Sequence, residues 1–432
     1  KLSELIFHFC PSKQENNRFI CFFDFYGEKL ENHKVATIIL MVSAPDPHPH
    51  KHLNLLCITH HDRFQGSTRS LFSLLEGLRA YPVTPHVIVP TESEFTIQLA
   101  RQGIPFKILP VPWWMSAKHL SPRARLKAVR EIQTAARAVE AQIRAWKIDL
   151  VYTNSSVTPI GRLAARRAGV PHIWQIREFG DLDFSLYPML PRPLFRQFIY
   201  SSQAIILNSQ AIKEHYFQKR TSPKLHVIYN GVAFSDQLKY PFPFNVLAFQ
   251  REVFTFLFIG SITAAKGFED AIMAIAEVRK KGINSRLIVA GTGKQDYIKK
   301  CKDLAHRQQV NEFIDFMGYL EDPSTAYSAA DCLLMCSKTE AFGRVTAEAM
   351  AAGLPVIGRN TGGTPELIVD GETGILFSSF DELVKAMLEL AQDRPLSQKL
   401  GLAGWQRARE LFSIEKCAAS VYQIIQSVVS KA

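Results

Sequence analysis

Short apolar runs alternate with amphipathic segments along most of the chain, from Leu53 onward. Apolar runs of about four to eight residues are typical of buried strands, and apolar positions at intervals of three and four are typical of helices. We expect strands at 53–59, 86–89, 106–109, 149–153, 172–176, 204–207 and 225–229, then at 254–260, 286–290, 313–317, 332–336 and 355–358. Because most of these strands are separated by helical patterns, the chain is predicted to form α/β domains with parallel sheets covered on both faces.

The clearest predicted helix runs from 122 to 146. Its apolar positions recur at intervals of three and four, at Val129, Ile132, Ala136, Val139, Ile143 and Trp146. Beside this stripe lie the cations Arg123, Lys127, Arg130, Arg137 and Arg144, and Trp113 and Trp114 are just upstream. A basic flank with nearby aromatics can rest on an anionic membrane. The alternative is the solvated outer face of a core helix, which the sequence alone favours slightly.

Residues 1–52 do not share the regular pattern. They contain aromatic clusters without clear periodicity, then a Pro- and His-rich run. A plausible start lies at Met41, so we expect the native protein to begin there and the first forty residues to be an extension; the alternative is a genuine N-terminal hairpin or tail. The run His48, His50 and His52 could bind a metal, but a solvated linker is the favoured interpretation.

The most informative stretch of the sequence runs from Asp331 to Glu366. A strand-like run at 332–336 leads through a loop to a predicted helix at 345–352, and a second short strand leads into a Gly-rich turn at 361–366. Such β-loop-α-β units place their loops at the carboxyl edge of a parallel sheet. The sequence therefore predicts a ligand site at this edge, with Cys332 and Cys336 in the core.

Two carboxylates flank the expected start of this helix. Glu340 lies in the loop and Glu348 inside the helix, with Phe342 and Gly343 between them. The free N–H groups of a helix N-terminus suit a phosphate, whereas a carboxylate repels one. We therefore expect each Glu to bind sugar or ribose hydroxyls, in a cradle for a nucleotide sugar. The alternative is an ordinary Rossmann-like unit with two surface Glu, which the spacing alone favours.

The arrangement E-x-F-G-x-x-x-x-E-A-M-A-x-G-x-P-V-I, followed by G-G-x-P-E-L-I-x-D-G-x-T-G, is more specific than this spacing. From about Leu53 onward the chain resembles the retaining glycosyltransferases of family 4, a GT-B group that includes bacterial mannosyl- and glucosyltransferases. The resemblance implies a GT-B fold, in which two Rossmann-like, doubly wound parallel-sheet domains face each other across a cleft. It implies an acceptor domain at 53–232, a linker at 233–252, a nucleotide-sugar domain at 253–404 and, at 405–432, a helix that packs back toward the first domain.

The resemblance also implies the site residues. Three residues are expected to be catalytic: Glu340, which would hold the donor sugar, Lys266, which would meet the diphosphate, and Arg177. Glu348 would meet the ribose, and the backbone near Tyr319 would meet the base. The expected donor-binding residues are Gly66, Ser67, Gly260, Ser261, Lys266, Gly318, Tyr319, Glu340, Phe342, Gly343, Arg344, Val345 and Glu348.

Three positions depart from the pattern of the family. Ser261 stands where an Arg is common, so one cationic phosphate ligand is missing, and Arg344 is a candidate substitute. Ser67 follows Gly66 where a second Gly is frequent. Arg177 stands where many members have a His near the transferred sugar. It could hold an anionic acceptor or the donor phosphate; the alternative is a buried Arg177–Glu178 arrangement that supports the loop.

Composition and charge narrow the choice of partners. The chain has 432 residues, 47% of them hydrophobic, which is enough for two domains, and its net charge of +11 favours anionic partners such as phosphorylated donors or anionic lipid surfaces. No nucleic-acid-binding motif is recognisable, so no nucleic-acid partner is expected. Seven scattered Cys without a CxxC pair argue against disulfides and a zinc site and fit a reducing cytosol.

We therefore expect an enzyme, a retaining and metal-independent glycosyltransferase. It would move a sugar from a UDP- or GDP-sugar to a glycan or lipid-linked acceptor in polysaccharide or glycolipid biosynthesis. No cofactor is expected, and the location would be the cytoplasm, with peripheral contact at the membrane face as a further option. The alternatives are a sugar phosphorylase or epimerase of the same fold, or a non-catalytic nucleotide-sugar-binding subunit, since Ser261 and Arg177 break two family positions.

Overall fold

The structure is a computed structural model, and it describes residues 14–15, 18–21, 40–43, 52–61, 64, 66–117, 120–238 and 252–431. Residues 1–51 and 52–432 form separate units. In the first unit, strands β1 (Gln14–Glu15), β2 (Arg18–Cys21) and β3 (Leu40–Ser43) pair antiparallel in this order. The expectation of an N-terminal extension and of a His-rich linker or metal site falls largely on residues outside those described.

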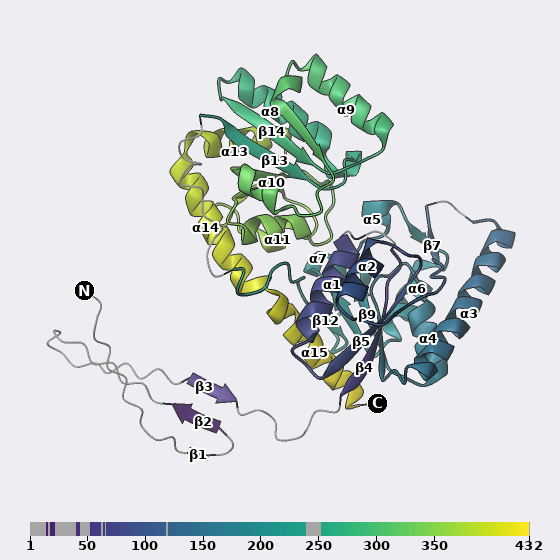
Figure 1. The fold of residues 1–432 in the computed structure, drawn as a ribbon. Helices are drawn as coiled ribbons and strands as arrows, with labels where there is room; N and C mark the ends of the chain where they lie inside the picture. Colours follow the sequence, from purple (N-terminus) through teal and green to yellow (C-terminus); the bar gives the residue numbers. More distant parts are fainter. Residues whose placement is uncertain are drawn as a thin grey trace. The chain divides into compact units, whose positions relative to one another are not determined.

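The first half of the second unit is built on a seven-stranded parallel sheet (Figure 1), with strand order β12-β11-β9-β8-β4-β5-β6. Its strands are β4 (Leu53–Ile58), β5 (Val83–Val89), β6 (Phe106–Ile108), β8 (Leu150–Thr153), β9 (His172–Ile176), β11 (Ala204–Leu207) and β12 (Leu225–Val227). The helices that connect them are α1 (Gly66–Leu78), α2 (Glu94–Arg101), α3 (Pro122–Ala145), α4 (Ile160–Ala168), α5 (Asp181–Phe184), α6 (Arg192–Tyr200) and α7 (Gln210–Phe217). A short antiparallel pair, β7 (Met115–Ser116) and β10 (Tyr187–Pro188), lies beside them.

The second half is built on a six-stranded parallel sheet with strand order β15-β14-β13-β16-β17-β18. Its strands are β13 (Phe254–Ile259), β14 (Ser285–Ala290), β15 (Ile314–Gly318), β16 (Cys332–Met335), β17 (Val356–Arg359) and β18 (Ile375–Phe377). Its helices are α8 (Phe268–Lys280), α9 (Gln295–Arg307), α10 (Ser324–Ala329), α11 (Arg344–Ala351), α12 (Thr364–Leu367) and α13 (Phe380–Gln392), with 3-10 turns η2 (Ala264–Lys266) and η3 (Asn311–Phe313).

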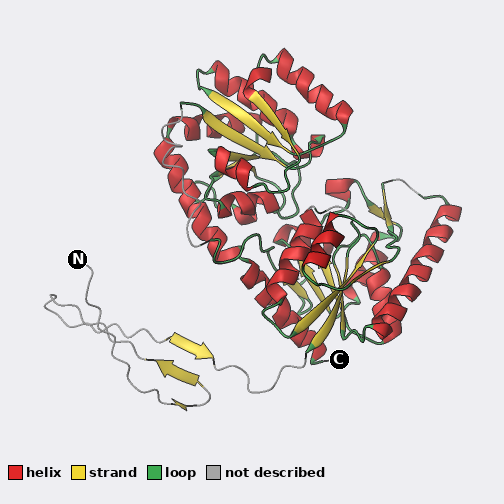
Figure 2. Cartoon of the chain, in the orientation of Figure 1, coloured by secondary structure: helices red, strands yellow, loops and turns green. Residues whose placement is uncertain are grey.

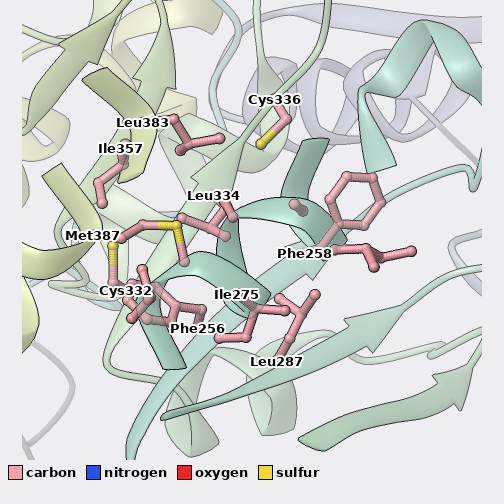
Figure 3. Packing of buried hydrophobic residues seen from close by; sticks show 14 of the residues in the cluster. Phe256, Phe258, Ile275, Leu287, Cys332, Leu334, Cys336, Ile357, Leu383 and Met387 are labelled. Atoms are coloured by element: carbon pink, nitrogen blue, oxygen red, sulfur yellow. The ribbon is translucent and has the colours of Figure 1, made fainter. Parts of the chain in front are cut away.

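Every strand predicted from Leu53 onward is confirmed, with ends that shift by a few residues, whereas β18 and the short strands β7 and β10 were not predicted. Most of the strands are largely apolar because helices cover both faces of each sheet, as the colouring in Figure 2 makes visible. In the second sheet, Phe256, Leu287 and Leu334 pack together with side chains of α8 and α13 (Figure 3). Cys332 and Cys336 belong to this core, as predicted.

The predicted single helix at 405–432 is wrong, because this segment spans the end of one helix and the whole of a second. The chain instead forms α14 (Arg394–Leu411) and α15 (Ile414–Val429). The break falls at Ser413, whose side chain accepts a hydrogen bond from the N–H of Lys416 and so caps a new helix. Helix α15 packs on the first sheet beside α1, and the approach is close because Gly77 faces Ala418 without a side chain.

The predicted apolar stripe of the helix at 122–146 is partly wrong. Helix α3 buries Ile132, Ala136, Val139 and Ile143, but Val129 is 45% exposed and Leu126 is 54% exposed. The first turns of α3 therefore extend beyond the core and expose apolar side chains among the cations. Over the described part of the chain, no helix combines the length and apolarity needed to cross a membrane.

Candidate active site

The carboxyl ends of the strands in both sheets bring loops from the two halves of the chain to one cleft. Two adjoining cavities lie there, of about 250 and 510 Å³. Both are lined by Gly66, the first residue of α1, and by residues of the second sheet's loops. The residues common to both cavities are Gly66, Ser261, Lys266, Glu340 and Arg344. This is the site location that the parallel strand pattern predicts.

All but one of the expected site residues line these cavities. The smaller cavity is lined by Gly66, Gly260, Ser261, Lys266, Tyr319, Glu340, Arg344, Val345 and Glu348. The larger one adds Ser67, Arg177, Phe342 and Gly343. Among the described residues of this set, Gly318 lines neither cavity. It ends β15 at φ 74°, and its carbonyl oxygen accepts a hydrogen bond of 2.7 Å from the N–H of Gly291.

Lys266 and Glu340 form an ion pair. The Nζ of Lys266 lies 2.6 Å from Oε2 of Glu340, and both side chains are partly exposed to the cavities. Lys266 ends the turn η2, and Gly267 follows it at φ 69°, where an added Cβ would overlap the carbonyl of Cys336. The backbone of this turn therefore lies directly on the end of β16, which sets the position of Lys266.

Arg344 and Glu348 form a second ion pair, one turn apart in α11. The Nε of Arg344 lies 2.7 Å from Oε1 of Glu348, and the hydroxyl of Tyr327 donates to Oε2 at 3.0 Å. Burial, and then the neighbouring carboxylate, raise the pKa of Tyr327 well above its usual value, so its hydroxyl keeps the proton that it donates. Tyr327 was not predicted as part of the site, because nothing in the sequence links α10 to α11.

The glycines of the Gly-rich turn hold the loop of Glu340. The N–H of Gly363 donates to the carbonyl oxygen of Glu340 at 2.7 Å. Gly362 has φ 57°, and an added Cβ would overlap that same oxygen. The turn at 361–366 was recognised from the sequence, but its contact with Glu340 was not.

Arg177 is buried and bound to two Asn side chains. Its Nε donates to Oδ1 of Asn154 at 2.6 Å, and its Nη1 donates to Oδ1 of Asn230 at 2.5 Å. Burial lowers the pKa of Arg177 from its usual value, although a guanidinium remains protonated in proteins. The hydrogen bonds of Glu178 go to other residues, Ser155 and Ser156, so the two side chains support different parts of the loop.

The chain matches two family models that together cover both halves of the cleft. Glycosyl transferases group 1 matches residues 242–407, and Glycosyltransferase Family 4 matches residues 64–235. The chain is a glycosyltransferase of the group 1, family 4 type.

Named relatives of this glycosyltransferase act on different molecules. It is 23% identical over 351 residues to the alpha-monoglucosyldiacylglycerol synthase of Acholeplasma laidlawii, covering 76% of this chain and 85% of the relative. It is 33% identical over 161 residues to the D-inositol 3-phosphate glycosyltransferase of Corynebacterium diphtheriae, covering 35% of this chain and 37% of the relative. The second match spans little more than a third of either protein.

Solved structures confirm the predicted GT-B fold of this glycosyltransferase. The Anabaena protein HepE, solved with UDP and glucose, has a TM-score of 0.71 at 20% identity and covers 87% of this chain and 100% of its own. A sucrose-phosphate synthase from Thermosynechococcus elongatus has a TM-score of 0.69 at 18% identity and covers 88% and 100%. At this identity the likeness shows the fold.

Contacts across the cleft join the two halves of this glycosyltransferase beside the cavities. The carboxylate of Glu366 accepts hydrogen bonds of 2.7 Å from the N–H groups of Gln210 and Ala211, at the start of α7. The hydroxyl of Ser209 donates to the carbonyl of Ala341 at 2.5 Å. The Glu340 loop is thus held from both sides, by the Gly-rich turn and by the first turn of α7.

Proposed function

We propose that this glycosyltransferase moves a sugar from a nucleoside-diphosphate sugar, with UDP or GDP as the nucleotide, to a glycan or lipid-linked acceptor. The observation that carries the proposal is the pair of cation–carboxylate contacts, Lys266–Glu340 and Arg344–Glu348, that line one cavity at the start of α11. Cations suit the phosphates of such a donor, and carboxylates suit its hydroxyls. The complexes of HepE with UDP and with UDP-glucose support the same donor class.

Binding of the donor would separate the cation and the carboxylate of each ion pair and give each of them a new partner on the donor. A diphosphate near the start of α11 would take Lys266 and the N–H groups of the first turn, which have no intrahelical partner. Glu340 would then be free for the hydroxyls of the sugar, and Glu348 for those of the ribose. Stabilising the departing diphosphate is the main electrostatic task of the transfer. Arg344 supplies further positive charge at the place where Ser261 supplies none.

We propose that the anomeric configuration is retained and that no metal is required. The leaving phosphate would take the proton of the acceptor hydroxyl on the same face of the sugar. Glu340 would therefore hold hydroxyls and not attack the anomeric carbon. The positive charge for the leaving group would come from Lys266, Arg344 and the α11 N-terminus. Within the described ranges, no cluster of three His, Cys, Asp or Glu side chains is arranged to hold a metal.

We also propose that the half of the chain that would bind the acceptor makes peripheral contact with an anionic membrane. Arg123, Lys127 and Arg130 are exposed on the first turns of α3, beside the exposed Leu126 and Val129. Exposed apolar side chains among cations suit the boundary between lipid headgroups and acyl chains. The name of the diacylglycerol-glucosylating relative supports a lipid acceptor.

A donor screen tests the proposal. Thermal shifts should be measured with UDP, GDP and ADP and with the corresponding sugars, followed by product analysis with pooled glycan and lipid acceptors, with and without EDTA. Stabilisation by one diphosphate, and sugar transfer that survives EDTA, is the expected result. Phosphate-dependent release or epimerisation of the sugar would instead identify a phosphorylase or an epimerase. Donor binding without turnover on any acceptor would identify a non-catalytic subunit.

A further inference from the structure

The larger cavity extends away from the donor cradle into the loops of the first sheet. There it is lined by apolar and aromatic side chains together with two imidazoles, two carboxylates and one guanidinium, among them His60, Trp113, Glu178, Asp183 and Arg177. A volume of about 510 Å³ falls within the range of small-molecule sites. Since the family motifs assign the residues other than Arg177 no role, their chemistry is an independent guide to what enters this part of the cavity.

Glu178 is the most firmly held group in this region. The residue is 5% exposed, and one oxygen, Oε1, accepts hydrogen bonds from the hydroxyl and the N–H of Ser156 and from the hydroxyl of Ser155, at 2.6 to 2.7 Å. Within the described chain, the hydrogen bonds of Glu178 all reach this oxygen. The side chain is therefore fixed in one orientation, and Oε2 has capacity to accept from a ligand.

Asp183 fixes the turn that carries Glu178. Its two carboxylate oxygens accept from the N–H groups of Phe179 and Gly180, at 2.9 and 2.8 Å. Gly180 has φ 85°, where an added Cβ would crowd the end of Met115. Burial is the largest of the influences that raise the pKa of Asp183 to about 6, so at neutral pH it is a carboxylate with a rigid structural role.

His60 provides a polar atom that the protein does not satisfy. Its Nδ1 is buried and has no hydrogen-bond partner among the residues that the structure describes. Burial lowers the pKa of His60 to about 3, so the ring is neutral and offers one donor and one acceptor. The ring of Trp113 lies edge-on to it at 5.5 Å between centroids, and Trp113 is 40% exposed. A buried polar atom without a partner is costly unless a ligand or water satisfies it.

We propose that His60, Trp113 and Glu178 form an acceptor subsite for an uncharged pyranoside ring. The inference rests on the proposed function and names the class of acceptor. A pyranose has an apolar C–H face that would pack on Trp113, and it has hydroxyls that donate to Glu178 and exchange hydrogen bonds with His60. Arg177 also lines the cavity, but its guanidinium is held by Asn154 and Asn230, so the two carboxylates of Glu178 and Asp183 would dominate and repel an anionic acceptor at this position.

Ligand-observed saturation-transfer NMR on the full chain with saturating UDP tests this subsite. The neutral probes are methyl α-D-glucopyranoside and methyl β-D-galactopyranoside, and the anionic probes are glucose 6-phosphate and glucuronic acid. We expect saturation transfer to at least one neutral probe and none to the anionic ones. Preferential binding of the anionic probes, or binding of no probe at all, would overturn the proposal.

Two variants and two controls assign the signal to this subsite. Glu178→Gln keeps the shape of the side chain and should weaken the binding of the neutral probe about tenfold or more. This is the range for loss of a hydrogen bond to a charged group. Trp113→Ala should also weaken it. Phe380→Ala, at another exposed aromatic, and Glu389→Gln, on the surface of α13, should leave it unchanged. If both test variants bind the probe normally, the subsite is wrongly placed.

The affinity for UDP separates failure of this inference from failure of the proposed function. Calorimetry with UDP should give the same dissociation constant for the unchanged chain, Glu178→Gln and Trp113→Ala, which also shows that the variants are folded. Normal UDP binding with no dependence of the pyranoside signal on Trp113 or Glu178 would reject the subsite alone. No binding of UDP, GDP or their sugars by the unchanged chain would reject the proposed function itself.

Discussion

The two walls of the cleft handle charge differently. On the wall of the second sheet, each cation contacts a carboxylate, as in Lys266–Glu340, and both members of the pair line a cavity. On the wall of the first sheet, Arg177 and Glu178 are buried and are held by neutral partners, among them Asn154 and Ser156. One wall carries ion pairs at the surface of the cavity, and the other carries single charges inside networks of neutral hydrogen bonds.

Because of this difference, the two walls can change their contacts to different extents when a ligand binds. A diphosphate sugar offers an anion for Lys266 and hydroxyls for Glu340, so both partners can be exchanged within one step of binding. Arg177 would have to leave Asn154 and Asn230, and a buried donor or acceptor without a partner is costly. We therefore expect the second-sheet wall to rearrange with the donor and the first-sheet wall to be preorganised for the acceptor.

The largest expected effect comes from the variant that removes the charge of Glu340. Contacts with the sugar tighten as its ring flattens toward the oxocarbenium ion, so Glu340→Gln should lower kcat by roughly 10–1000-fold. UDP or GDP alone should bind almost normally. Steady-state kinetics and diphosphate calorimetry measure the two quantities, with Glu389→Gln as a surface control. Normal turnover, or loss of diphosphate binding, would contradict the assigned role.

Lys266→Ala tests the cation of the same pair. Loss of a charged hydrogen-bond donor to the diphosphate should weaken the binding of UDP or GDP by about 10–100-fold, whereas the bare nucleoside should bind normally. The vacated position also leaves Glu340 without its partner, which adds repulsion toward the phosphates. Lys300→Ala is the matched control, because Lys300 makes a similar pair with Glu269 on the surface, at 2.8 Å. Equal losses for nucleoside and diphosphate would show that Lys266 is structural.

The sequence predicted the second-sheet wall far better than the first. Glu340, Gly343 and Glu348 lie within one short stretch, so their order along the chain already fixes their arrangement at the start of a helix. The first-sheet wall is assembled from loops that are distant in sequence. Glu178 meets Ser156 across 22 positions, and His60 meets Trp113 across more than twice that separation. Such contacts depend on strand order, which periodicity alone does not provide.

Two glycine variants separate the support that the Gly-rich turn gives the Glu340 loop from the effect of a left-handed backbone conformation alone. Gly362→Ala should destabilise the protein by about 1–3 kcal/mol and reduce activity, because the new Cβ would overlap the carbonyl of Glu340. Gly371→Ala is the control, since Gly371 has a similar φ of 71° but open space around its Cβ position. Denaturant unfolding measures both. Equal destabilisation would mean that only the left-handed conformation matters and that the loop contact is unimportant.

Glu348→Ala should raise the KM for the donor about tenfold. Contacts with the ribose are the same in the ground and transition states, so kcat should change little. The hydroxyl of Tyr327 would lose its acceptor, so Glu348→Gln, which keeps an oxygen there, serves as the second variant. A loss confined to kcat in either variant would exchange the roles assigned to Glu340 and Glu348.

The smallest effect is expected far from the ion pairs, at the first turns of α3. If Arg123, Lys127 and Arg130 face an anionic leaflet, each neutralisation to Gln should reduce partitioning onto phosphatidylserine-containing liposomes about fivefold, since a cation near such a surface contributes about 1 kcal/mol. Binding should also weaken as salt rises, because the attraction is screened.

Neutralising Lys299, Lys302 and Arg307 on α9 changes the net charge equally at another exposed helix and should have less effect. Equal losses for both helices would indicate a general response to net charge, and unchanged co-sedimentation of the α3 variants would leave α3 as a solvated face. A loss specific to α3 would mean that the half of the molecule that carries the first-sheet wall, which we propose for the acceptor, also meets the membrane.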